Sequence, residues 1–191
     1  MIRVLFAATI FCSAFLLFLV QPLISKQILP WFGGSAAVWA TCMVFFQVML
    51  LAGYAYADLS SRLAPRRQAL LHCLLLAVSV LLLPAIPAAR WKPDGTEDPS
   101  IRILLLLAAT IGLPYFMLSS TGPLLQFWGS RTLGDPRVYR YFSLSILASL
   151  LALACYPFLI EPNAALRWQA LAWSALYAAF AVSCGAAALY A

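Results

Sequence analysis

The polar residues that could bind a substrate begin in Leu19–Trp39, a stretch between two apolar runs. It holds Gln21, Lys26 and Gln27, with two prolines and a Gly-Gly pair. Two amides and an ammonium supply hydrogen-bonding groups and a positive charge. Polar groups at membrane depth are costly and usually face protein or water. One interpretation places these side chains at the outer opening of a cavity. The other is a kinked corner from which Lys26 reaches the head groups.

A second set of candidates lies in Leu113–Arg131, where Ser119, Thr121 and Gln126 accompany two prolines and Gly122. Such a stretch would break a helix in water, but within a membrane bundle hydroxyl groups can satisfy the freed carbonyls. A broken helix that lines a cavity is one interpretation. Close helix packing around a local kink is the alternative.

The sequence gives no sign of catalysis or of a cofactor. It has no Ser-His-Asp set, no paired carboxylates and no phosphate-binding glycine loop, so no catalytic residue is expected. His72 is expected to be a packed or interfacial residue, with a proton relay as the alternative. The five cysteines each lie inside an apolar run. They are expected to be buried thiols, and neither a metal site nor a disulfide framework is predicted.

These residues must be positioned by membrane helices. The 191 residues are 64% hydrophobic and 9% charged, with a mean hydropathy of +0.93. Soluble domains have about 25% charged residues. A membrane span needs about 20 mostly apolar residues. The sequence therefore predicts an all-α bundle in a lipid bilayer, one domain over residues 1–191 with six transmembrane helices at about Val4–Leu23, Ala36–Ala57, Ala69–Ile86, Ile103–Phe127, Tyr141–Ile160 and Trp168–Tyr190.

The charges predict how this bundle is oriented. The net charge is +6, but the basic residues fall in short breaks between spans, as membrane topology requires, so no nucleic-acid partner is expected. Seven arginines would share one side, which is therefore assigned to the cytoplasm together with both termini: Arg3, Arg62, Arg66, Arg67, Arg131, Arg137 and Arg140. The other side carries five basic residues and the acids Asp94, Glu97 and Asp98. Glu161 ends the fifth span there, either as an interfacial cap or close to Lys26 if the first and fifth helices are neighbours.

The loop after the second span, "GYAYADLSSRLAPRRQ", resembles the cytoplasmic loop signature of the major facilitator superfamily. The resemblance gives Gly53, Asp58, Arg62 and Arg66 the signature positions. It implies that the aspartate pairs across the bundle and gates movement of one half against the other. The spacing from Gly53 to Asp58 is one residue longer than in the signature, and the glycine between the arginines is missing. The alternative is a solvated basic loop.

Longer phrases resemble the membrane part of bacterial fused major facilitator/spermidine synthase-like proteins. They include "FLVQPLISKQILPWFGGSAAVWATCMVFFQVMLLAGYAYADL" and "PYFMLSSTGPLLQFW". The resemblance implies half of a major facilitator fold in the bacterial inner membrane. It also implies a synthase-like domain in a longer protein, but the glycine loop and acids of that domain are not in this sequence.

The leading hypothesis is a transporter-like module for polyamines or other small cations. It would need a second copy or a downstream half of the same protein. Transport would bring Gln21, Lys26, Ser119, Thr121 and Gln126 to one wet cavity. The alternative is a non-transporting scaffold or anchor for a synthase-like domain or a membrane complex. In a scaffold these groups would be paired internally.

Overall fold

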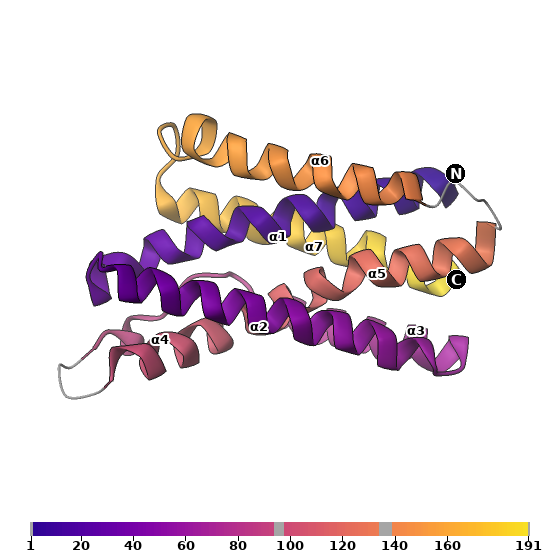
Figure 1. The fold of residues 1–191 in the computed structure, drawn as a ribbon, viewed down its shortest axis with the longest axis horizontal. Helices are drawn as coiled ribbons and strands as arrows, with labels where there is room; N and C mark the ends of the chain where they lie inside the picture. Colours follow the sequence, from indigo (N-terminus) through magenta and orange to yellow (C-terminus); the bar gives the residue numbers. More distant parts are fainter. Residues whose placement is uncertain (1, 94–97, 134–138, 191) are drawn as a thin grey trace.

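The computed structural model describes residues 2–93, 98–133 and 139–190, except for the side chains of residues 132, 133 and 139. These residues form helices and no strand, and the helices pack lengthwise into an elongated bundle (Figure 1). The expected all-α class is confirmed. The elements are α1 (Ile2–Phe32), α2 (Ala36–Ser61), α3 (Pro65–Leu81), η1 (Ala89–Trp91), α4 (Pro99–Leu107), η2 (Ala108–Gly112), α5 (Leu113–Leu133), α6 (Tyr139–Cys155), η4 (Tyr156–Ile160) and α7 (Leu166–Tyr190).

Five helical stretches of the described chain are long and apolar enough to cross a membrane: Ile2–Phe32, Ala36–Ser61, Pro99–Arg131, Arg140–Ile160 and Leu166–Tyr190. The third of these joins α4, the π-helical η2 and α5 into one rod. The fourth joins α6 to the π-helical η4. These lengths and compositions agree with a membrane protein that has the lipid bilayer as its surroundings.

The 17-residue α3 differs in its bounds from the expected span at Ala69–Ile86. It begins earlier, at Pro65, because proline suits the first turn of a helix, where its missing N–H would have no partner. It ends earlier, at Leu81, because Pro84 and Pro87 follow closely and cannot continue a helix.

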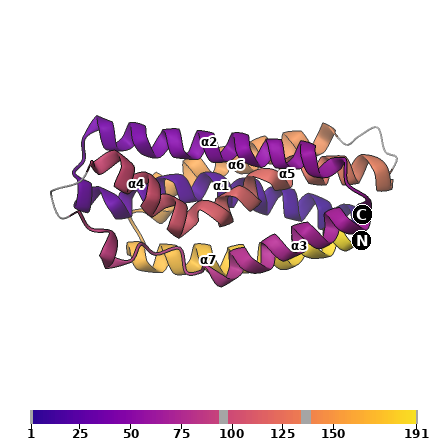
Figure 2. The same ribbon diagram turned by 90° about the horizontal axis from the view of Figure 1, so that it is seen from below.

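The helix α1 lies in the middle of the bundle and packs against α5, α6 and α7 (Figures 1 and 2). It runs through Pro22 and Pro30 and ends at Phe32. It therefore extends beyond Leu23, where the expected span ends. Gly33 then turns the chain with φ of +81°, a conformation that favours glycine. The Ser35 hydroxyl accepts a hydrogen bond from the Val38 amide at 3.4 Å and caps α2.

The start of α1, the end of α7 and the junction of α2 with α3 lie at one end of the bundle, here called the terminal end (Figure 1). The corner between α1 and α2, the start of α4 and the turn before α7 lie at the opposite end, called the corner end. Three charged residues named in the sequence analysis lie outside the described residues: Asp94, Glu97 and Arg137.

The helices α2 and α5 approach each other closely at Gly53. A Cβ atom at this position would overlap the Ser119 hydroxyl and lie 2.8 Å from the Ser119 Cβ and 3.0 Å from the Ser120 amide nitrogen. The Ser119 hydroxyl also donates to the Met49 carbonyl of α2 at 3.3 Å. Membrane helices associate through such close packing because lipid is as apolar as their side chains. The glycine of the loop resemblance thus has a packing role here.

We expect Gly53→Ala to lower the free energy of unfolding by about 1–3 kcal/mol, the usual cost of overpacking. The added methyl group would push α5 away from α2. Unfolding by sodium dodecyl sulfate in mixed micelles measures this change. Gly122→Ala is the matched control, because a Cβ there meets nothing within 4 Å. Equal stability of the two variants would contradict the close approach of α2 and α5.

Candidate functional site

The candidate site is a groove of 430 Å³ over α1, at the corner end of the bundle. Residues from three parts of the chain line it: Pro22, Lys26 and Leu29 of α1, Trp39 of α2, and Leu153, Tyr156, Pro157 and Glu161 of α6, η4 and the turn that follows. Figure 1 shows α1 between α6 and α2. The groove is the part of α1 that these two neighbours leave uncovered.

An ion pair between Lys26 and Glu161 lies in this groove. The Lys26 ammonium donates to the Glu161 carboxylate, and the two side chains are 40% and 38% exposed. Of the two alternatives for Glu161, the structure therefore shows the approach to Lys26. Pairs this exposed contribute only about 0–1 kcal/mol in water. The pair can therefore separate at little cost, which leaves the carboxylate available to another cation.

Tyr156 supplies the groove with an unmet hydrogen-bonding group. Its side chain is 4% exposed, and its buried hydroxyl has no partner among the described residues. Burying such a hydroxyl costs about 1–3 kcal/mol. Tyr156 opens the π-helical η4, in which the Glu161 amide donates to the Tyr156 carbonyl at 2.8 Å. Such π-helical turns occur frequently at functional sites.

Sequence reasoning did not identify Tyr156 or Trp39 as residues of this groove. The available signal was Pro157, because a proline inside an apolar span removes a backbone donor and frees a carbonyl in the preceding turn. That signal indicates an irregular turn, but it does not say which helix the turn faces.

Gln21 and Gln27, predicted beside Lys26, do not line the groove as the structure describes it. The Gln21 amide donates instead to the Tyr115 hydroxyl of α5 at 3.0 Å, so it joins two helices. Gln27 is half-buried, and its amide oxygen is buried without a partner in the described chain. Their role in substrate binding remains a prediction.

Ser119 and Thr121 are buried and bonded within their own helix. Ser119 donates to the Phe116 carbonyl at 2.8 Å, and Thr121 donates to the Met117 carbonyl at 2.6 Å. Ser119 lines a separate cavity of 80 Å³ with residues of α1, α2 and α6. At about 30 Å³ per water molecule, that volume holds only a few waters. Gln126 is half-buried further along α5. The described structure therefore does not gather the predicted set into one cavity.

The predicted gating residues lie at the terminal end. Arg62 donates to the Asp58 carboxylate at 2.7 Å, an i,i+4 pair within one helix turn whose side chains are 71% and 66% exposed. Arg66 is exposed in the first turn of α3. Asp58 is thus paired locally, whereas the resemblance implies a partner across the bundle.

A buried polar network ties α3 to its neighbours near the same end. His72 lies 3.3 Å from the Tyr56 hydroxyl and 3.4 Å from the Cys184 sulfur. The Trp128 indole donates to the Gln68 amide oxygen at 3.1 Å. His72 is fully buried, which confirms the expectation of a packed residue. Within the described chain, no three His, Cys, Asp or Glu residues gather as metal ligands would.

Comparison with known protein families, curated proteins and solved structures finds no match for this chain. The resemblance to fused facilitator/synthase-like proteins therefore stays a prediction.

We expect Gln21→Leu to lower the free energy of unfolding by about 1–2 kcal/mol. The substitution leaves the Tyr115 hydroxyl, in a side chain only 1% exposed, without its donor. Gln47→Leu, on the exposed face of α2, is the matched control and should be neutral. Denaturant titration in micelles measures both variants. An unchanged free energy of unfolding in Gln21→Leu would mean that the Gln21–Tyr115 hydrogen bond does not stabilise the packing of α1 against α5.

Proposed function

We propose that the chain is a membrane transport module, similar to half of a major facilitator, that takes up small cations such as polyamines through the groove over α1. The observation that carries this proposal is the Lys26–Glu161 pair beside the unpartnered Tyr156 hydroxyl. A substrate ammonium can replace the Lys26 ammonium on the Glu161 carboxylate. It can also donate a hydrogen bond to the Tyr156 hydroxyl oxygen.

The proposed module has six membrane helices, with α3 as the sixth. Its 17 residues extend about 25 Å, slightly less than the hydrocarbon core of about 30 Å. Exposed Arg66 and Arg67 at its start can extend to the head groups and cover that difference. The arginine-rich terminal end would face the cytoplasm of a bacterial inner membrane.

A partner is part of the proposal, because the groove is open on one side. The helices that border it, α2 and α6, are the least buried of the five membrane-capable helices. A second copy of the chain, or a downstream half of the same protein, would close the groove into a pathway. A synthase-like domain beyond this sequence is a further part of the hypothesis.

The second candidate function is a non-transporting scaffold or anchor. It is favoured by the internal bonds of Ser119, Ser120 and Thr121 and by the small cavity beside Ser119. Fully paired polar groups rigidify a bundle. A scaffold needs this rigidity, and a pathway through these residues would need open space.

Transport is tested by uptake of labelled spermidine into proteoliposomes. We expect Glu161→Gln to lower uptake at least about ten-fold, because a lost charge-assisted hydrogen bond is worth about 1.5–3 kcal/mol. Gln47→Ala is the matched control and should retain uptake, because this residue lies on the exposed face of α2 and outside the groove. Parent protein that takes up no more than empty vesicles would refute transport and favour the scaffold.

The orientation is tested with single cysteines in a variant that lacks the native ones. A membrane-impermeant maleimide should label Arg167→Cys in intact spheroplasts, and Arg66→Cys only after permeabilisation. Both positions are exposed and lie at opposite ends of the bundle. Labelling of the two positions from the same side would exclude the proposed six-helix topology.

A further inference from the structure

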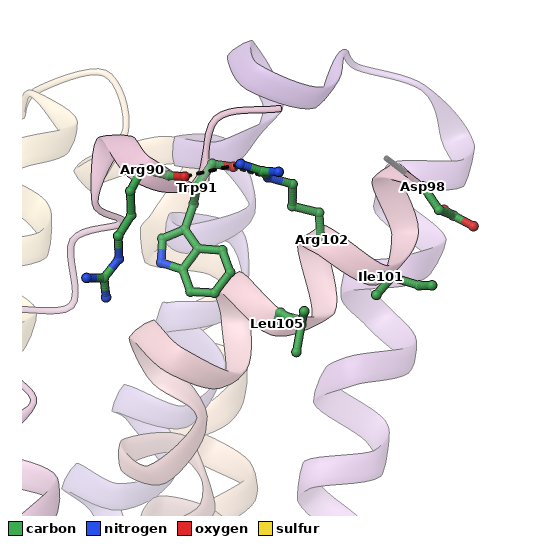
Figure 3. Close-up of a pocket in the computed structure, with 6 residues that line it drawn as sticks. All are labelled: Arg90, Trp91, Asp98, Ile101, Arg102 and Leu105. Atoms are coloured by element: carbon green, nitrogen blue, oxygen red, sulfur yellow. Dashed lines mark hydrogen bonds between the residues drawn. The ribbon is translucent and has the colours of Figure 1, made fainter. Parts of the chain in front are cut away.

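A second hollow, of 580 Å³, lies at the corner end beside α4 and away from the groove over α1. It is lined by Arg90 and Trp91 of η1 and by Asp98, Ile101, Arg102 and Leu105 at the start of α4 (Figure 3). None of the residues predicted to bind substrate lines it. It combines cationic, aromatic and apolar side chains at the level where the bundle ends.

Arg102 holds the two walls of this hollow together. Its guanidinium donates to the carbonyls of Trp91 at 3.2 Å, Arg90 at 3.2 Å and Lys92 at 2.8 Å. Figure 3 shows the side chain reaching from α4 to the turn that carries Arg90 and Trp91. A planar guanidinium suits such multiple contacts. The backbone of η1, from which the Arg90 and Trp91 side chains extend, is therefore held at a fixed place relative to α4.

Arg90 is the group that can bind an anion. Its guanidinium lies over the Trp91 ring, 5.9 Å from the ring centre, and no carboxylate of the described residues pairs with it. Figure 3 shows the Arg90 and Trp91 side chains extending from the turn in the same direction, alongside α4. Arginine binds phosphate through two parallel N–H groups. Tryptophan is enriched at the head-group level of membranes.

Asp98, the acidic residue of the hollow, is already engaged. Its carboxylate accepts the Ser100 amide at 2.8 Å and caps α4. In Figure 3 it lies at the far side of the hollow from Arg90 and points away from it. Its charge therefore stabilises the helix start and is not positioned to neutralise the Arg90 guanidinium.

The apolar wall indicates that the anion carries hydrocarbon chains. Ile101 and Leu105 are 60% and 54% exposed, and they are one turn apart on the same face of α4. A soluble anion would gain nothing from these side chains. An acyl chain that continues from a phosphate would cover them.

We propose that this hollow is a binding site for a glycerophospholipid of the outer leaflet. The Arg90 guanidinium, backed by Trp91, binds the phosphodiester, and the acyl chains lie against Ile101 and Leu105. Arg102 is a positioning residue, because it fixes the turn that carries Arg90. The site does not depend on the transport function and would serve a scaffold equally well.

The test is native mass spectrometry of delipidated protein titrated with phosphatidylglycerol in detergent. We expect Arg90→Gln to raise the dissociation constant of the first bound lipid about ten-fold, because a charge-assisted hydrogen bond is lost. Arg167→Gln is the matched control. It removes an exposed basic residue at the same end, at the start of α7, and should leave that constant unchanged. Dioleoylglycerol, which lacks the phosphate, should not compete.

Two results would overturn the proposal. Equal weakening by Arg90→Gln and Arg167→Gln would mean general attraction between basic residues and anionic lipid. Displacement of the lipid by inorganic phosphate or glycerophosphoglycerol at the same concentrations would mean a site for a soluble anion. If Arg90→Gln does not fold, Arg90→Lys replaces it. That variant keeps the charge but loses the two parallel hydrogen bonds to the phosphate, so we expect several-fold weaker lipid binding. Unchanged lipid binding would refute the contact between Arg90 and the phosphate.

Discussion

The packing of α1 against α5, α6 and α7 is the contact on which the described bundle depends. Lipid provides no hydrophobic force between helices, so close packing and hydrogen bonds between helices must supply the attraction. Three such bonds lie along α1. The Ser13 hydroxyl donates to the Leu118 carbonyl at 2.9 Å, the Trp173 indole donates to the Leu16 carbonyl at 3.0 Å, and Gln21 binds Tyr115. Polar groups of α1 thus form hydrogen bonds that connect it to α5 and α7.

The groove follows from the same packing. Three helices cover α1 except for one stripe between α2 and α6, which remains half-buried. Pro22 and Lys26 lie on this stripe. Proline at position 22 leaves the carbonyl one turn earlier without its usual donor, yet the helix continues because its neighbours hold it in place. Lys26 follows one turn later and binds Glu161, which lies directly after η4.

The two π-helical turns adjust which side chains meet. In η4 the extra residue of the π turn shifts the residues that follow it around the helix axis, and Glu161 comes directly after this turn. In η2 a π turn lies within the long rod that also contains the Ser119–Thr121 segment. These turns leave the rods continuous, so backbone amides keep partners inside the membrane-capable stretches. The groove with the Lys26–Glu161 pair and the hollow beside α4 both lie at the corner end. The long helices remain continuous there.

Hydropathy and length determined the helices: the apolar runs predicted the all-α class, and all but α3 begin and end close to the expected spans or extend them. The prolines and the Gly-Gly pair of Leu19–Trp39 also indicated a corner between the first two spans. The sequence could not determine which polar residues meet. These helices are apolar on nearly every side, so periodicity does not distinguish the face that packs on protein from the face toward lipid. Lys26 and Glu161 are 135 positions apart, and Gln21 and Tyr115 are 94 apart. Only the tertiary packing decides such pairs, because each depends on which helices are neighbours and how each is rotated about its axis.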